Sequence, residues 1–408
     1  MKFLKTIRVE ELKQILDEIP KITLEEELID LDLAFGRVIS ENVVSSIDVP
    51  HFRKSRMDGY AVVAEDTFTA DENNNISLKL IETIQAGDKP QKEVKKGQCS
   101  YVATGAAIPQ GANGVVMVEF TEKQDNTIYI SQAVTPDTYI IKVGHDVAKG
   151  GVIVPENSMI TLPTIGILAS CGIDKVKVYK KPTVSLISTG NELVPLNVES
   201  LEIGKIYDVN SHVLKEAIES TGCNVNSFGI IKDDLENLKN AFDKAFNSSN
   251  IIILSGGTSK GEGDLGPQIL ENHKGLEIFI HGVRIKPGKP LIFAKIKSKD
   301  IFILPGYPTS ALSCYYVFIE NFLRKMSGLP LKEKDSKEFE LAERIYSTVG
   351  RHEFKPIKIK ELEGVKKIVP IQTGSEAIST LFYADGYIEI EELESIIEKG
   401  ETRTVYFF

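Results

Sequence analysis

A glycine-rich loop near the middle of the chain has the composition of an anion-binding site. Residues 255–264 contain four glycines and follow the apolar run 251–254. Glycine lets neighbouring backbone N–H groups point toward one anion, and hydroxyl and ammonium groups add donors. The pattern predicts a phosphate cradle or, as the alternative, a plain turn after a strand; it is not a Walker A loop, because the Gly-Lys-Ser/Thr ending is missing. The cradle residues are Ser255, Gly256, Gly257, Thr258, Ser259, Lys260 and Gly261.

A basic turn follows the glycine-rich loop. Residues 281–290 include Arg284, Lys286 and Lys289 and contain no acidic residue. In a chain with a formal net charge of -10, this local excess of positive charge points to an anionic ligand. We expect the Pro-Gly pair at 287–288 to turn the chain so that the three cations face one anion. The alternative is a solvated hairpin.

Three carboxylates end loops near the predicted cradle. Glu192 and Asp264 each end a loop that follows a predicted strand, and Asp233 follows the strand between them in sequence. Paired carboxylates beside a phosphate commonly hold Mg²⁺. We therefore predict Glu192 and Asp264 as Mg²⁺ ligands and Asp233 as an outer-sphere ligand. Capping of the helices that follow is the alternative for each.

These groups all lie in a stretch, residues 182–328, where predicted strands and helices alternate. The strands are apolar on both faces, which is typical of a parallel sheet covered by helices on both sides. In such sheets ligands bind where loops leave the carboxyl ends of the strands. Three loops, 188–193, 255–264 and 305–310, should open on this edge, and the third contains Pro305, Gly306 and Pro308. The predicted strands are 183–188, 225–231, 251–254, 291–296 and 301–304, and a long apolar helix follows at 310–326.

Outside residues 182–328, the sequence predicts a different set of elements. Helical spacing predicts a helix over 9–19, and a capping box at Thr23 predicts a second helix over 23–36. Short β-type runs between polar turns predict two further β regions. The predicted domains are a helical or mixed scaffold (1–50 and 141–181), an inserted β domain (51–140), a three-layer α/β domain (182–328) and a C-terminal β domain (329–408).

Composition excludes several classes of protein. The chain has 408 residues, enough for several domains, and its pI near 5.4 argues against a nucleic-acid binder. No apolar run approaches the ~20 residues that cross a bilayer, and the first residues show no signal-peptide pattern. The four cysteines are scattered without metal-ligand spacing. We therefore expect a reducing, cytoplasmic location and no membrane partner.

Taken together, the motifs resemble the molybdopterin molybdenumtransferase family, which includes MoeA and the gephyrin E domain. The matching segments occur in the same order as in the family, over nearly the whole chain. As an ordered set, they are specific to this family. They are Met57–Ala61, Thr104–Ala106 with Pro109 and Gly111, Gly144–Val147 with Gly150, Ser188–Leu193, Tyr207–Asn210, Ser255–Gly257 with Ser259, Gly261 and Asp264, Lys286–Pro290, and Leu304–Gly306 with Pro308.

The resemblance implies a fold and an activity. The fold would be an elongated homodimer of four-domain subunits, with a three-layer α/β domain and a C-terminal β-barrel-like domain. The activity would be insertion of molybdate into adenylylated molybdopterin, with Mg²⁺-dependent release of AMP and molybdenum cofactor. An adenylyltransferase or cofactor-accepting proteins would be transient partners. The residues implied in catalysis are Asp58, Thr104, Asp146, Glu192, Asp264, Lys286 and Lys289, and the weaker matches for molybdate are Arg351 and Ser375, next to Gly350 and Gly374.

Three positions depart from the family pattern. Tyr307 stands where Asn is usual, Asn191 where Asp is common, and Leu265 where Tyr is common. We expect these departures to affect the choice between molybdate and tungstate and the catalytic rate rather than the fold. Two rival functions remain: a molybdopterin adenylyltransferase, whose loop typically has Gly where Ser259 stands, and a non-catalytic scaffold, which predicts loss of site residues that are present here.

Overall fold

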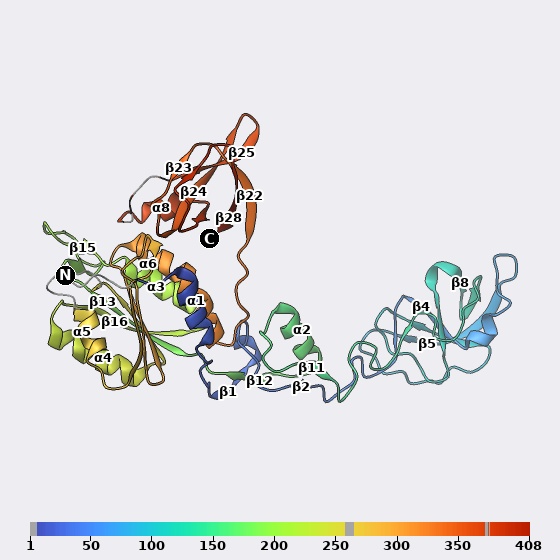
Figure 1. Ribbon diagram of the computed structural model, residues 1–408. Helices are drawn as coiled ribbons and strands as arrows, with labels where there is room; N and C mark the ends of the chain where they lie inside the picture. Colours follow the sequence, from blue (N-terminus) through green and yellow to red (C-terminus); the bar gives the residue numbers. More distant parts are fainter. Residues whose placement is uncertain (1–5, 258–264, 372–373, 375) are drawn as a thin grey trace. The chain divides into compact units, whose positions relative to one another are not determined.

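The computed structural model describes residues 6–257, 265–371, 374 and 376–408. The chain divides into two compact units (Figure 1). One unit combines the N-terminal segment to Glu27 with Gly36–Val38 and Tyr179–Phe408. The other comprises Leu28–Phe35 and Ile39–Val178.

A six-stranded sheet forms the centre of the first unit. Its order is β16 (Asn224–Ile231), β13 (Thr183–Thr189), β17 (Ile251–Ser255), β21 (Lys299–Leu304), β20 (Ile292–Ile296) and β18 (Leu276–His281). The first four strands are parallel, and β20 and β18 are antiparallel to their neighbours. The predicted parallel sheet is confirmed, with an antiparallel extension at one edge.

Helices cover both faces of this sheet, as Figure 1 shows for α3 (Asn210–Glu219) and α4 (Leu235–Ser248). Ile251 and Ile253 of β17 pack on the face covered by α3 (Asn210–Glu219), whereas Ile252 and Leu254 pack on the face covered by α4. Each strand therefore contributes apolar side chains to two cores, and burial of each stabilises the fold by roughly 1.5–3 kcal/mol. The three-layer α/β prediction is confirmed. The other helices of this domain are α4 (Leu235–Ser248), α5 (Leu265–Glu271), α6 (Pro308–Cys314) and α7 (Glu320–Met326).

The predicted apolar helix over 310–326 forms but is not uniform. A π-helical segment, Tyr315–Ile319, separates α6 from α7. Tyr315 lies in the core, and its hydroxyl donates a hydrogen bond to Ala217 O of α3 at 2.5 Å. The predicted N-terminal helix is α1 (Val9–Glu18), and it buries one apolar face in the same core. Among the described residues, no helix has the length and apolar character needed to span a membrane.

The C-terminal domain contains a closed β-barrel. Its strands are β22 (Ser336–Leu341), β24 (His352–Leu362), β25 (Val365–Pro370), β26 (Gly386–Ile390) and β28 (Thr402–Phe407). The pairings run β24–β25–β22–β28–β26 and return to β24, so the sheet closes. A short parallel bridge joins β19 (Ile285–Lys286) to the start of β24. The predicted β-barrel-like domain is confirmed, and the basic turn is hydrogen-bonded to it.

The second unit holds a β domain and a smaller mixed module. The β domain is a six-stranded sheet of order β7 (Gly114–Met117), β4 (Gly59–Val62), β6 (Gln98–Val102), β5 (Ile76–Ile84), β9 (Thr127–Ile130) and β8 (Thr121–Gln124). In the module, β2 (Val43–Val44) pairs with β11 (Val152–Val154), and α2 (Leu162–Ser170) carries a Thr161 N-cap. Chain segments before and after the β domain build this module together.

The predicted helix over 23–36 is wrong. Glu26–Asp30 forms strand β1, which pairs with β12 (Lys175–Tyr179), and Leu31–Leu33 is a single 3-10 turn. Burial alternates along β1, as in a strand with one covered face. The capping-box pattern at Thr23 is a local preference, and pairing with a strand almost 150 residues away overrides it.

All four cysteines are buried as free thiols. Cys99 lies on β6, Cys171 ends α2, Cys223 precedes β16 and Cys314 ends α6. Burial raises the pKa of Cys99 to about 12, and it also raises the pKa values of Cys314 and Cys223. Thiolate chemistry is therefore suppressed at these three positions.

Replacing Asp234 with alanine should destabilise α4. The Asp234 carboxylate accepts a hydrogen bond from Asn237 N at 2.9 Å and caps the helix. We expect Asp234→Ala to lower the free energy of unfolding by about 1 kcal/mol, measured by urea denaturation. Lys239→Ala, an exposed change in the same helix, is the matched control. Equal stability of the two variants would contradict the capping role.

Candidate functional site

The loops after β13 and β16 are joined through one carboxylate. Asp233 accepts hydrogen bonds from Thr189 Oγ1 at 2.6 Å and from Asn191 N at 3.3 Å. The amide oxygen of Asn191 in turn accepts from Asp233 N at 3.2 Å. A neutral Asn at this position avoids placing a second carboxylate beside Asp233. Asp233 thus fixes the edge of the sheet, while its neighbour Asp234 is the helix cap.

A second residue joins the loops after β17 and β21. Asn210, the first residue of α3, donates from Nδ2 to Ser255 Oγ and to Gly306 O, both at 2.8 Å. Gly256 N also donates to Leu304 O at 3.0 Å. The sequence did not predict this bridge. The Tyr207–Asn210 motif was the available signal, but it did not reveal the partners.

Gly256 shows why the cradle requires glycine. Its φ is +101°, and an added Cβ would lie 2.3 Å from Thr189 O. Any side chain here would push the loop away from the end of β13. Ser255, Gly256, Gly257, Pro305 and Gly306 therefore meet at the carboxyl edge of the parallel strands, as predicted. Thr258, Ser259, Lys260, Gly261, Asp264 and Ser375 lie outside the described residues.

Glu192 is exposed at the same edge. Its carboxylate lies over Gly190, because a Cβ added to Gly190 would be 2.8 Å from either carboxylate oxygen. The next element is the short strand β14 (Leu193–Val194), so Glu192 does not cap a helix. Of the two interpretations of Glu192, capping is excluded, and an exposed carboxylate beside the cradle remains.

The basic turn lines a cavity of about 540 Å³ between the α/β sheet and the barrel. Among the described residues, four cations line it: Lys286 and Lys289 from the turn, and Arg351 and Lys355 from the barrel. Sequence reasoning named the first three, whereas Lys355 was missed because it appeared only as part of a strand. Other lining residues are Pro305, Tyr307, Ser310, Glu353 and Gly374. A concave site with this charge suits a multiply charged anion.

Glu353 is the acidic residue among the described residues that line the cavity. Its side chain is 4% exposed, and its Oε2 accepts from Ser347 Oγ at 2.7 Å and from Lys286 Nζ at 3.1 Å. Lys355 Nζ lies 3.7 Å from Oε1. A buried carboxylate requires such partners, and in return it holds the two ammonium groups in place. In the described part of the lining, cations still outnumber acids.

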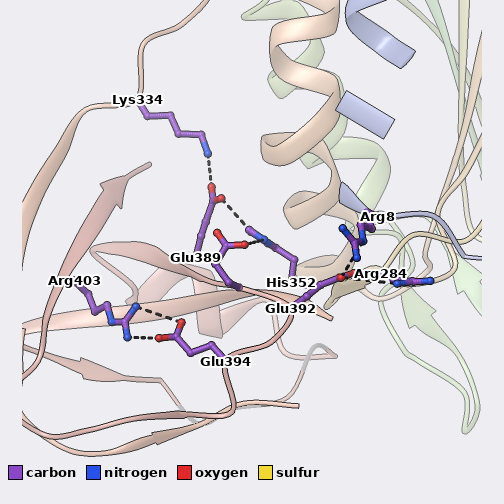
Figure 2. Close-up of polar contacts among 9 residues, drawn as sticks. Arg8, Arg284, Lys334, His352, Glu389, Glu392, Glu394 and Arg403 are labelled. Atoms are coloured by element: carbon purple, nitrogen blue, oxygen red, sulfur yellow. Dashed lines mark hydrogen bonds and ion pairs between the residues drawn. The ribbon is translucent and has the colours of Figure 1, made fainter. Parts of the chain in front are cut away.

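Arg284 is directed elsewhere. Its guanidinium lies 3.9 Å from Glu392, whose carboxylate is also 3.5 Å from Arg8 Nε (Figure 2). The prediction that Arg284 shares an anion with Lys286 and Lys289 therefore fails, because a carboxylate of the C-terminal domain holds its charge. The turn itself packs closely on α6: an added Cβ at Gly288 would lie 2.5 Å from Cys314 Sγ.

In the second unit, two predicted residues meet. Asp58 Oδ1 accepts hydrogen bonds from Thr104 N at 2.7 Å and from Thr104 Oγ1 at 3.0 Å, and both residues are exposed. Asp146 is exposed in the turn around Gly144, where its backbone N–H donates to Val49 O. The structure thus joins Asp58 to Thr104 and holds Asp146 on a separate turn.

Comparison with known proteins assigns the family. Family models match residues 7–172 (MoeA N-terminal region, domain I and II), 185–325 (probable molybdopterin binding domain) and 338–408 (MoeA C-terminal region, domain IV). The molybdopterin molybdenumtransferase of Haemophilus influenzae is 32% identical over 396 residues, covering 96% of both chains. The chain belongs to the molybdopterin molybdenumtransferase (MoeA) family.

Other MoeA-family comparisons agree. A putative molybdopterin biosynthesis protein of Methanocaldococcus jannaschii is 36% identical over 417 residues, covering 97% of that protein. Gephyrin of Dictyostelium discoideum is 31% identical, and the chain spans 60% of its length. Two solved structures of the MoeA protein from Pyrococcus horikoshii align with TM-scores of 0.83 and 0.81, at 35% and 32% identity and 99% coverage of this chain. The family resemblance seen in the motifs is therefore confirmed.

Proposed function

We propose that this MoeA-family protein inserts molybdate into adenylylated molybdopterin, with Mg²⁺-dependent hydrolysis that releases AMP and molybdenum cofactor. The observation that carries the proposal is the cationic cavity, where Lys286, Lys289 and Arg351 converge beside the loop at Pro305. The substrates are a pterin nucleotide and a tetrahedral oxyanion, and both are anions. Relatives named molybdopterin molybdenumtransferase support the reaction class.

The chain's own groups suit hydrolysis of a phosphoanhydride. That reaction needs positioning and neutralisation of charge more than covalent chemistry. Lys286 and Lys289 would hold phosphate oxygens. The backbone N–H of Gly257 would add a donor, whereas that of Gly256 already donates to Leu304 O. Arg351 offers a planar donor pair to molybdate, a dianion. The sulfur ligands of molybdenum come from the pterin, so the four buried cysteines need play no part.

The residues at the sheet edge also fit Mg²⁺. Oxygen ligands are those that Mg²⁺ prefers, and the exposed Glu192 carboxylate offers them. Both oxygens of Asp233 already accept hydrogen bonds from the chain, which suits an outer-sphere position. On sequence grounds alone, the family motif that ends the glycine-rich loop adds Asp264 as an inner ligand. When bound, Mg²⁺ would neutralise charge on the phosphates.

We also propose a cytoplasmic homodimer that receives its substrate from an adenylyltransferase through transient contact. Family resemblance supports the dimer, and the exposed Asp58–Thr104 pair of the second unit is suited to contact a ligand. The family resemblance implies functional roles for Asp58, Thr104 and Asp146. Size-exclusion chromatography with light scattering measures the assembly directly.

The function is tested by following AMP release. Purified protein with adenylylated molybdopterin, Mg²⁺ and molybdate should release AMP and yield cofactor that reconstitutes an apo-molybdoenzyme. Tungstate in a parallel reaction measures oxyanion selection, because Tyr307 lines the cavity where the family usually has Asn. A folded protein that releases no AMP with either oxyanion would overturn the proposal.

Replacing Lys289 with alanine should lower AMP release by about a hundredfold or more, because one positioned cation is lost from the cavity. Folding and assembly should stay unchanged, since Lys289 is half-buried at the cavity wall. Lys244→Ala, an exposed change on α4, is the control for loss of a surface charge. Wild-type release by Lys289→Ala would place phosphate binding elsewhere.

A further inference from the structure

A histidine outside the cationic cavity has one ring nitrogen without a hydrogen bond. His352 is the first residue of β24, and its side chain is 3% exposed. Within the described part of the chain, its buried Nδ1 atom has no hydrogen-bond partner. A buried nitrogen of this kind has lost its hydration without gaining a hydrogen bond, so it is a candidate to bind a ligand.

The other ring nitrogen is already engaged. His352 Nε2 lies 3.1 Å from Glu389 Oε2, and Glu389 also pairs with Lys334 Nζ at 2.5 Å (Figure 2). A carboxylate that faces an ammonium group accepts hydrogen bonds, so Nε2 carries the proton and donates. In that tautomer, Nδ1 presents its lone pair to its surroundings. This carboxylate–histidine arrangement is the one that orients metal-binding histidines.

Two further carboxylates face the same point. Glu10 in the first turn of α1 and Glu391, just after β26, each bring an oxygen into a group with His352 Nδ1 in which all three atoms lie within 4.8 Å of one another. Glu391 Oε2 is 3.7 Å from Nδ1. Both glutamates are exposed and free to move by the roughly 1 Å that closing around an ion with ligand bonds near 2.1 Å requires.

We infer that Glu10, His352 Nδ1 and Glu391 form a site for a divalent transition metal of the zinc type, with Glu389 as the outer-shell partner of the histidine. One nitrogen and two carboxylate oxygens suit Zn²⁺ or Co²⁺, whereas Mg²⁺ prefers oxygen ligands alone. The ion joins α1 to the barrel. It is distinct from the Mg²⁺ proposed at the sheet edge, because the two ligand sets share no residue.

The site adjoins the cationic cavity through the backbone. Ile285 pairs with His352 and Lys286 pairs with Glu353 in the parallel bridge between β19 and β24. Fixing His352 therefore fixes the start of β24, next to the buried Glu353 that holds Lys286. The metal has a structural role, holding the barrel wall of the cavity against α1.

Metal binding is measured on the tag-free full-length protein, stripped with a chelator and dialysed into buffer with millimolar Mg²⁺. The excess Mg²⁺ fills sites made of oxygen ligands. Calorimetric titration with Zn²⁺ should give one site per chain, and Co²⁺ should give the visible absorption of a low-coordinate complex. Thermal denaturation should shift upward by several degrees with Zn²⁺.

Substitutions at the three proposed ligands, with one control, test which residues bind Zn²⁺. Glu10→Gln and Glu391→Gln change exposed residues and should each weaken Zn²⁺ binding by about tenfold or more, and His352→Gln should abolish it. Asp17→Asn, which removes another exposed carboxylate of α1, should bind as wild type. If His352→Gln does not fold, the two glutamate variants still carry the test. Absence of Zn²⁺ binding, or equal affinity in both glutamate variants and wild type, would show that the cluster is not a metal site.

Discussion

Lys286→Met should reduce AMP release by about a hundredfold or more and should also destabilise the fold. Lys286 lines the cavity, and its ammonium group is the kind of positioned charge that phosphoryl transfer needs. The same change leaves the buried Glu353 without its closest cation, at 3.1 Å. We expect the free energy of unfolding to fall by about 2 kcal/mol, measured by urea denaturation.

A double variant separates these two effects. In Lys286→Met/Glu353→Gln, no buried carboxylate is left uncompensated, and the glutamine can still accept the Ser347 hydrogen bond. Stability should therefore return toward that of the wild type, while AMP release stays low. Glu353→Gln alone is the reference for loss of the carboxylate. Recovery of AMP release in the double variant would mean that Lys286 acts only through Glu353.

Gly256→Ala should abolish activity, because it displaces the backbone of the loop after β17. The residue has φ +101°, and the new Cβ would lie 2.3 Å from Thr189 O, so the loop must shift. We expect a loss of about 2–4 kcal/mol in stability, because steric strain and an unfavourable φ act together. Substrate binding, measured by calorimetry with the adenylylated pterin, should weaken by about a hundredfold or more, since the N–H donors move with the loop.

Gly257→Ala is the matched control for this change. Its φ is +70°, yet its added Cβ would meet Thr189 Cγ2 only at 3.4 Å, which is an ordinary contact. Strain at φ alone should cost about 1 kcal/mol. Equal melting temperatures for the Gly256 and Gly257 variants would show that the close approach to Thr189 is not important.

The central sheet could be predicted from sequence because its signal is local. The run 251–254 is apolar at every position, so the strand must be covered on both faces. The carboxyl ends of such strands meet at one edge, which places Ser255 and Pro305 together without knowledge of any side-chain contact. Gly256 correctly indicated the tight loop after β17, because the positive φ that requires glycine is a property of the turn itself.

Long-range pairing accounts for most of what was not predicted. Strand β6 mixes Cys99 and Ser100 with larger residues and shows no clear alternation, and it is a strand because β4 and β5 flank it. Glu26–Asp30 likewise takes its conformation from a distant partner. In both cases, neighbours that are far away in sequence decide the structure.

The same argument applies to side chains of the site. Lys355 reaches the cavity because the barrel closes beside the basic turn, and Asn210 bridges two loops that are about 50 residues apart in sequence. Arg284 lies two residues before Lys286 but is held by Glu392, more than 100 residues later. Residue type and local spacing identify which groups can do chemistry, whereas the partners that orient them come from the complete fold.

Because all four cysteines are buried, their reaction with a thiol reagent can report local unfolding. Cys99 lies in the inserted sheet, Cys171 at the end of α2, and Cys223 and Cys314 in the α/β domain. A thiol reagent reaches each one only when the segment around it opens, so its labelling rate reports the local opening free energy. Mass spectrometry of the labelled peptides would thus rank the parts of the chain by their resistance to opening, without introducing any probe.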